Sequence, residues 1–112
     1  MTYRGIATLL LSASLALSAC AKKEERVFFD GVYFPVKDKA IKDDRQSFVV
    51  TVRRAERSIK GAREAGRHGG TDYCLKNFGT SDIEWTLGPD VPDHLLERSG
   101  GNLVFRGRCV LW

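Results

Sequence analysis

The first twenty residues, Met1 to Cys20, decide which part of the chain is left to form a domain. Arg4 places a positive charge near the start, and residues 6–19 form an uncharged run rich in Ala, Leu and Ser. A charged start, an apolar middle and small residues at the end are the layout of a secretory signal peptide. The run covers about 14 residues, whereas a helix that crosses a ~30 Å hydrocarbon core needs about 20. We therefore predict a removable export signal over residues 1–19 rather than a transmembrane helix.

The four residues that close this segment, Leu17-Ser18-Ala19-Cys20, resemble the lipobox of bacterial lipoproteins. The resemblance implies that the chain is cut before Cys20, that its sulfur receives a diacylglycerol and that the new amino group is usually acylated, with palmitate as the expected acyl chain. Ala21 stands where an Asp would retain such a lipoprotein at the inner membrane, so it favours the outer membrane. A second interpretation stays open, because Ala19-Cys20-Ala21 is also an Ala-x-Ala cleavage site, with a cut before Lys22 and no lipid.

The residues that follow predict one small domain on a short tether. Residues 21–26 read Ala-Lys-Lys-Glu-Glu-Arg, and a polar tether of this length reaches ~20 Å when fully extended. The rest of the chain, about 90 residues, is enough for one domain and too short for two. The formal net charge is only +4, which in an exported protein argues against a nucleic-acid partner.

Two cysteines remain once Cys20 is assigned to lipid, and these are Cys74 and Cys109. The bacterial periplasm is oxidising, so an exported pair most simply forms a disulfide. Such a bond would close a loop of about 36 residues and stabilise the domain by ~4 kcal/mol in the chain-entropy model. Metal ligation and a catalytic thiol are the alternatives, and no Cys-x-x-Cys spacing supports either.

Alternation of apolar and polar residues predicts four strands, since successive side chains of a strand point to opposite faces. The strands fall within residues 27–40, 48–52, 83–87 and 102–112, with inward residues Val32, Phe34 and Val36; Phe48, Val50 and Val52; Ile83, Trp85 and Leu87; and Leu103, Phe105, Gly107, Cys109 and Leu111. Pro35 cannot donate to a ladder, so the first strand should lie at an edge or contain a bulge. Asp30-Gly31 could form a tight turn, but arms of three residues would be unusually short, and we expect an irregular start instead.

One helix is predicted between the second and third strands, over residues 54–79, with Ser58 as N-cap and Gly79 as its stop. Its inward face would consist mostly of small residues: Ala62, Ala65, Gly66, Gly69, Tyr73 and Asn77. Each glycine within it costs about 1 kcal/mol relative to Ala. The pattern leaves open a break near Gly69-Gly70, and it also leaves open a ligand-binding loop at this glycine pair.

The order strand, strand, helix, strand, strand predicts an α+β domain over residues 27–112. Its economical packing is a two-layer β-β-α-β-β fold, a mainly antiparallel four-stranded sheet with one helix on one face. Cys109 would point to the buried side of the sheet, where the helix carries Cys74 near its far end, in keeping with one disulfide. Residues 88–101 are expected to form a loop, with one helical turn at residues 93–98.

The domain also resembles small uncharacterised lipoproteins of alphaproteobacterial envelopes. The resembling stretches are Phe29-Asp30-Gly31, Phe48-Val49-Val50-Thr51-Val52, Glu64-Ala65-Gly66-Arg67, Tyr73-Cys74 and residues 78–85. The resemblance bears on fold and location, and it implies no activity.

The most basic part of the chain is the predicted helix. Four of its cations could contact anionic headgroups: Arg57, Lys60, Arg63 and Arg67, of which Arg57, Lys60 and Arg67 recur near helical spacing. Each charge near an anionic membrane adds about 1 kcal/mol. Glu56 and Glu64 interrupt the strip, so a solvated helix face is the simpler interpretation.

Two other groups of residues suggest weaker hypotheses. Tyr33, Trp85 and Trp112 could line a groove for a peptide or a glycan, although Trp85 fits the core and Trp112 is the best candidate for an exposed contact. His68 and Asp72 lie four residues apart and could bind a metal with His94, but no zinc-type spacing supports this. We expect surface residues there, and we assign no catalytic residue, no metal and no cofactor.

These observations favour a lipid-anchored protein of the bacterial envelope that faces the periplasm and acts as a non-enzymatic binding or scaffold module. Its predicted partners are the membrane, through the lipid, and another envelope protein, which could add a strand to the exposed sheet edge. Contact of the basic helix with an anionic membrane is the first alternative. A small envelope enzyme is disfavoured, because no acid, base and nucleophile converge in the sequence.

Overall fold

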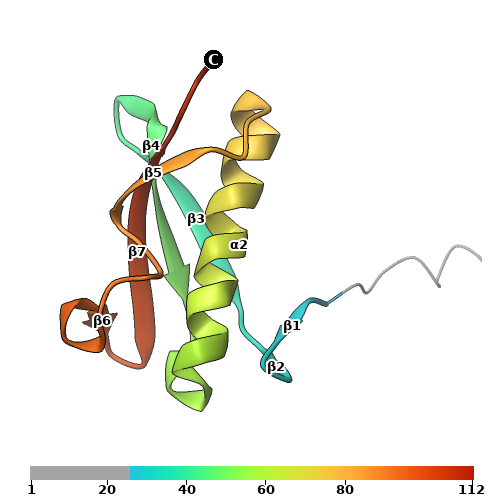
Figure 1. Cartoon of the computed structure of the whole chain (residues 1–112), viewed down its shortest axis with the longest axis vertical. Coiled ribbons are helices and arrows are strands. Elements are labelled where there is room, and N and C mark those ends of the chain that lie inside the picture. The colour runs from blue at the N-terminus through green and yellow to red at the C-terminus, as the bar shows by residue number, and fades with distance from the viewer. Residues whose placement is uncertain (1–25) are drawn as a thin grey trace, which may run out of the picture.

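One long helix lies across one face of an antiparallel sheet in the computed structural model, which describes residues 26–112 (Figure 1). The strands β3 (Val36–Ile41), β4 (Asp44–Val52), β7 (Asn102–Cys109) and β5 (Ile83–Leu87) are neighbours in that order. The short strand β6 (Glu97–Ser99) also pairs with β7. The predicted α+β fold with one helix on a mainly antiparallel sheet is therefore confirmed.

The core lies between the helix and the sheet, and the predicted alternation of β4 supplies much of it. Phe48, Val50 and Val52 are buried, and they pair in register with Gly107, Phe105 and Leu103 of β7, of which Phe105 and Leu103 are also fully buried side chains. Because strand residues alternate in direction, this register directs one face of both strands toward the helix.

The first predicted strand is divided in the structure. Asp30 and Gly31 both adopt positive φ angles, 53° and 72°, and join β1 (Phe28–Phe29) to β2 (Val32–Tyr33) in a separate small hairpin. Our expectation of an irregular start was wrong, because positive φ at both central residues is what a type I′ hairpin turn requires. The short arms are supported from outside, since the ring of Phe29 lies 5.6 Å from that of His68 on the helix.

The helix α2 (Ile59–Phe78) begins and ends where its caps predict. The Ser58 hydroxyl accepts a hydrogen bond from the Gly61 amide at 3.0 Å, and Gly79 ends the helix with φ 71°. The predicted start at Arg54 was too early, because η1 (Ala55–Arg57) is a separate 3-10 turn. The helix is continuous through Gly69-Gly70, so no break or ligand-binding loop forms there.

The glycines of α2 allow the helix to lie unusually close to the sheet. A methyl group on Gly66 would overlap the ring of Phe105, and one on Gly69 would lie 2.8 Å from Cγ1 of Val36. Ala62 and Ala65 are fully buried beside them, whereas Asn77 is exposed rather than inward as predicted. The helical cost of the glycines is therefore offset by close packing of helix on sheet.

The disulfide predicted between Cys74 and Cys109 is present, and it joins the last turns of α2 to the end of β7. The two Cα atoms are 5.5 Å apart, and both cysteines are fully buried. The bond links the two layers of the domain covalently at one end.

The C-terminal half departs from prediction in two places. The predicted loop 88–101 contains the 3-10 turn η2 (Asp93–Leu95), which lies within the helical turn expected at residues 93–98, and also the strand β6, which was not expected. The last strand ends at Cys109, so Leu111 is 48% exposed and its predicted inward position was wrong. The amide of Val110 donates to the carbonyl oxygen of Asp82, just before β5 begins, and beyond it the chain leaves the sheet. None of the helices within residues 26–112 has the length and apolar character needed to cross a membrane.

Candidate functional site

Arg63, one of the four cations of the predicted basic strip, holds a loop rather than facing solvent. Its guanidinium donates to the carbonyl oxygen of Pro89 at 2.9 Å, to that of Val91 and to the carboxylate of Asp93. Its side chain is only 18% exposed. Arg63 therefore fixes the segment after β5 against the helix.

Arg67 is engaged by the same segment. Its Nη1 and Nη2 donate to the two carboxylate oxygens of Asp90, and its Nε donates to Glu64 at 3.4 Å. The hydrogen bond from Arg67 holds the pKa of Asp90 below its ordinary value, and the same bond raises the pKa of Arg67. The charge of Arg67 is thus already balanced within the domain.

The basic strip is divided as a result. Arg57 and Lys60 are exposed and form no ion pair with the rest of the described chain. The structure does not test whether the four residues contact anionic headgroups of a membrane, so that contact stays a prediction. The partners of Arg63 and Arg67 in the segment after β5 lie 23 to 30 residues further along the chain, where helical periodicity gives no indication of them.

The aromatic residues of the second hypothesis do not line a common groove. Trp85 packs on the core, with its ring at 79° to that of Phe48 and 5.6 Å away, as expected. Trp112 is 94% exposed, and its indole Nε1 donates to Asp82 at 2.8 Å. Tyr33 belongs to the β1–β2 hairpin, at the opposite end of the domain from the C-terminus (Figure 1).

The residues considered for a metal have other neighbours. His68 packs on the ring of Phe29, and the carboxylate of Asp72 pairs with Lys76 at 3.0 Å. This pair raises the pKa of Lys76. His94 lies apart in the exposed η2 turn. Within residues 26–112, no cluster of three His, Cys, Asp or Glu side chains could hold a metal ion.

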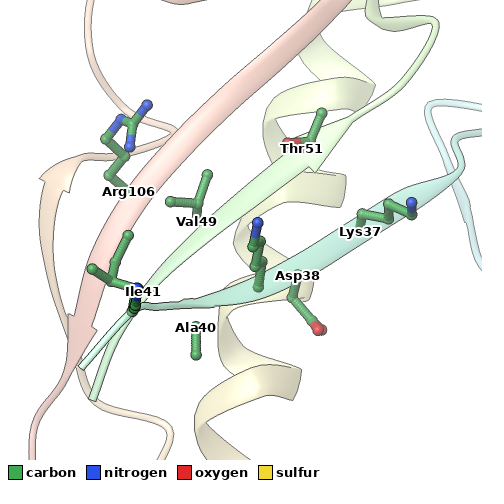
Figure 2. A pocket seen from close by; sticks show the side chains of 9 residues that line it. Lys37, Asp38, Ala40, Ile41, Val49, Thr51 and Arg106 are labelled. Atoms are coloured by element: carbon green, nitrogen blue, oxygen red, sulfur yellow. The ribbon is translucent and has the colours of Figure 1, made fainter. Parts of the chain in front are cut away.

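A groove that the sequence did not lead us to expect lies on the face of the sheet turned away from α2 (Figure 2). Its volume is about 560 Å³. Val50 and Val52 face the helix, so the alternate residues Val49 and Thr51 stand on the opposite face and form the floor. The strand β3 forms one wall, and Arg106 of β7 stands at the other.

Strand register gives the groove its dimensions. Lys39 pairs with Val49, and Val49 pairs with Arg106, so the three residues form one row across β3, β4 and β7. Neighbouring strands lie about 4.8 Å apart, which places the two walls roughly 10 Å apart at the backbone. Lys37 lies two residues before Lys39 on the same side of β3, about 7 Å away along the strand.

The groove is positively charged. Lys37, Lys39 and Lys42 line it, are exposed and form no ion pair within residues 26–112. Arg106 donates from Nε and Nη2 to both carboxylate oxygens of Glu97, at 3.2 and 3.0 Å, which raises its pKa.

Asp38 is the one carboxylate among the described residues that line the groove. It pairs in register with Val50, whose side chain faces the helix. Alternation along the strand therefore directs Asp38 away from the neighbouring lysines, and Figure 2 shows it pointing away from Val49 and Thr51. The floor face of the groove thus keeps its positive charge.

The residues of this groove also follow the alternation of the two strands β3 and β4. Lys37 and Lys39 alternate with Asp38 and Ala40, while Val49 and Thr51 alternate with the core residues of β4. Placing the two patterns on one face requires the register between the strands and the position of β7, which the sequence alone does not supply.

Comparison of the chain with family models, with curated proteins and with solved structures finds no match.

Proposed function

We propose that the chain is a lipid-anchored module of the bacterial cell envelope, facing the periplasm, that binds another envelope component without catalysing a reaction. The observation that carries this proposal is the buried disulfide between Cys74 and Cys109. Disulfides persist in oxidising compartments such as the periplasm. With these two cysteines paired, Cys20 is the one remaining cysteine of the chain, and it lies outside the described residues.

The start of the domain supports an anchor close by. The hairpin begins at Phe28, eight residues after Cys20. Val27 and Phe28 are 49% and 61% exposed, and Arg26 lies 4.9 Å above the ring of Tyr33. Aromatic residues and cations are the side chains that favour a membrane interface. A lipid on Cys20 would hold this hairpin near the membrane surface.

Binding rather than catalysis is supported by the fact that several reactive and charged side chains near the helix are already bonded within the domain. Cys74 and Cys109 are joined and have no thiolate to offer. Arg63 and Arg67 hold the segment after β5. The cationic groove over β4 is a surface suited to a partner rather than to a reaction.

The anchor is tested by the intact mass of the protein extracted from membranes of cells that produce it. We expect a chain that begins at Cys20 and carries a diacylglycerol with at least one further acyl chain. The variant Cys20→Ser should lose that mass and leave the membrane fraction, because the several acyl chains on Cys20 provide the attachment. A chain cut before Lys22, or one that retains Met1 to Ala19, would contradict the proposal.

A further inference from the structure

We propose that the groove over β4 binds an extended acidic segment of a partner polypeptide, with carboxylates at alternate positions. The proposal rests on the proposed function, because it names the chemistry of the component that the anchored module binds. The groove runs along β3, which supplies most of its lining, with Val49 and Thr51 as its floor and Arg106 of β7 on the far side. A site of this shape fits a narrow, linear ligand.

The charge of the walls selects an anion. Lys37, Lys39 and Lys42 have no ion-pair partner within the described chain, so an incoming carboxylate would not have to displace another. Arg106 donates two of its N–H groups to Glu97. A guanidinium has five donors in all, so others remain for a ligand. Both walls can therefore donate to carboxylates of the ligand.

The spacing of the lysines selects an extended peptide. Lys37 and Lys39 lie about 7 Å apart on one side of β3, because both belong to a single strand. Side chains of an extended peptide that point to one side repeat at the same distance, roughly 7 Å, for the same reason. A peptide laid over Val49 and Thr51, with every second residue Glu or Asp, would thus match both lysines at once.

Two other occupants fit less well. Strand addition to the outer edge of β3 is opposed by Pro35 at its start, by its outward lysines and by Asp38 on the helix side, which are features that protect edge strands. An anionic membrane is a broad surface, and it would touch the walls of the groove without reaching Val49 and Thr51. We therefore treat the membrane as an outcome of the test.

The test uses the full chain in nonionic detergent at low salt and two labelled peptides that each contain four glutamates. One peptide has Glu at every second position and Thr between, and the other has Glu at every third position. We expect the first to bind roughly threefold more tightly by fluorescence anisotropy, because only it can form both ion pairs on β3. The double variant Lys37→Gln/Lys39→Gln should weaken its binding roughly fivefold and remove the preference.

The matched control is Arg57→Gln/Lys60→Gln, which removes two exposed, unpaired cations from the helix side and should leave both affinities unchanged. Equal affinity for the two peptides, or an equal loss in the control variant, would overturn the proposal. So would binding of micelles that contain an anionic phospholipid through Lys37 and Lys39 without binding of the peptide. None of these results would bear on the mass of the N-terminus, so failure of the groove and failure of the anchor are distinguishable.

Discussion

Replacement of both Cys74 and Cys109 by Ala is expected to lower the free energy of unfolding by about 4 kcal/mol. The two cysteines are separated by 35 positions, and the bond restricts the unfolded chain by closing that loop. A small domain is stable by only about 5–15 kcal/mol in total, so this loss would be a large share. The bond also joins α2 to β7, so its removal releases the contact between the two layers at that end.

Urea denaturation of the full chain in nonionic detergent, followed by circular dichroism, measures this effect. Cys20→Ser is the matched control, since it removes a cysteine outside the described domain and should leave the free energy of unfolding unchanged. A loss below about 1 kcal/mol in the double variant, typical of an ordinary substitution, would show that the disulfide is not a major source of stability.

Gly66→Ala is expected to destabilise the domain by about 3 kcal/mol, although Ala is the better helix former. Helix propensity alone predicts a gain of about 1 kcal/mol for this change. In the structure, however, the added methyl group would overlap the ring of Phe105, which is itself fully buried in β7. The helix must then move away from the sheet, and overpacking of this kind costs about 1–3 kcal/mol or more.

Helix propensity predicts that Gly66→Ala raises the free energy of unfolding, whereas the contact with Phe105 predicts that it lowers it. One urea titration therefore distinguishes the two explanations. Lys60→Ala provides the control on the same helix, because Lys60 is exposed and its replacement should change the free energy of unfolding by less than about 0.5 kcal/mol. A variant Gly66→Ala that is more stable than the parent would contradict the close packing of α2 on the sheet.

Local patterns predicted those parts of the fold that local interactions determine. Ser58 and Gly79 bound the helix as expected, because capping depends on residues within one turn. Phe48, Val50 and Val52 face the core, since alternation needs only one strand. The cysteine pair could be assigned because the expected export of the chain and the number of its cysteines together favour a disulfide.

Features that depend on distant partners could not be predicted in this way. The β1–β2 hairpin is too short to be stable alone, and it is held by Phe29 against the helix. The strand β6 exists because β7 extends beside it. Leu111 continues the alternation of β7, but the sheet ends at Cys109 and leaves it exposed.

In the candidate sites, too, local sequence predicted some features, while others depend on residues that are distant in the chain. The basic residues of the helix were visible in the sequence, but the roles of Arg63 and Arg67 depend on Asp93 and Asp90, which the fold brings to them. The groove over β4 combines three strands from two halves of the chain, so only the sheet order reveals it.

The central claim, an exported domain that is oxidised and anchored by its first cysteine, is tested most directly by trapping the free thiols of the protein as cells are lysed. Cells that produce the protein are treated with an alkylating reagent under denaturing conditions without a reductant, and the adducts on the chain are counted by mass spectrometry. The account predicts no adduct, because Cys74 and Cys109 form the disulfide and Cys20 carries lipid. Adducts on all three cysteines would contradict it.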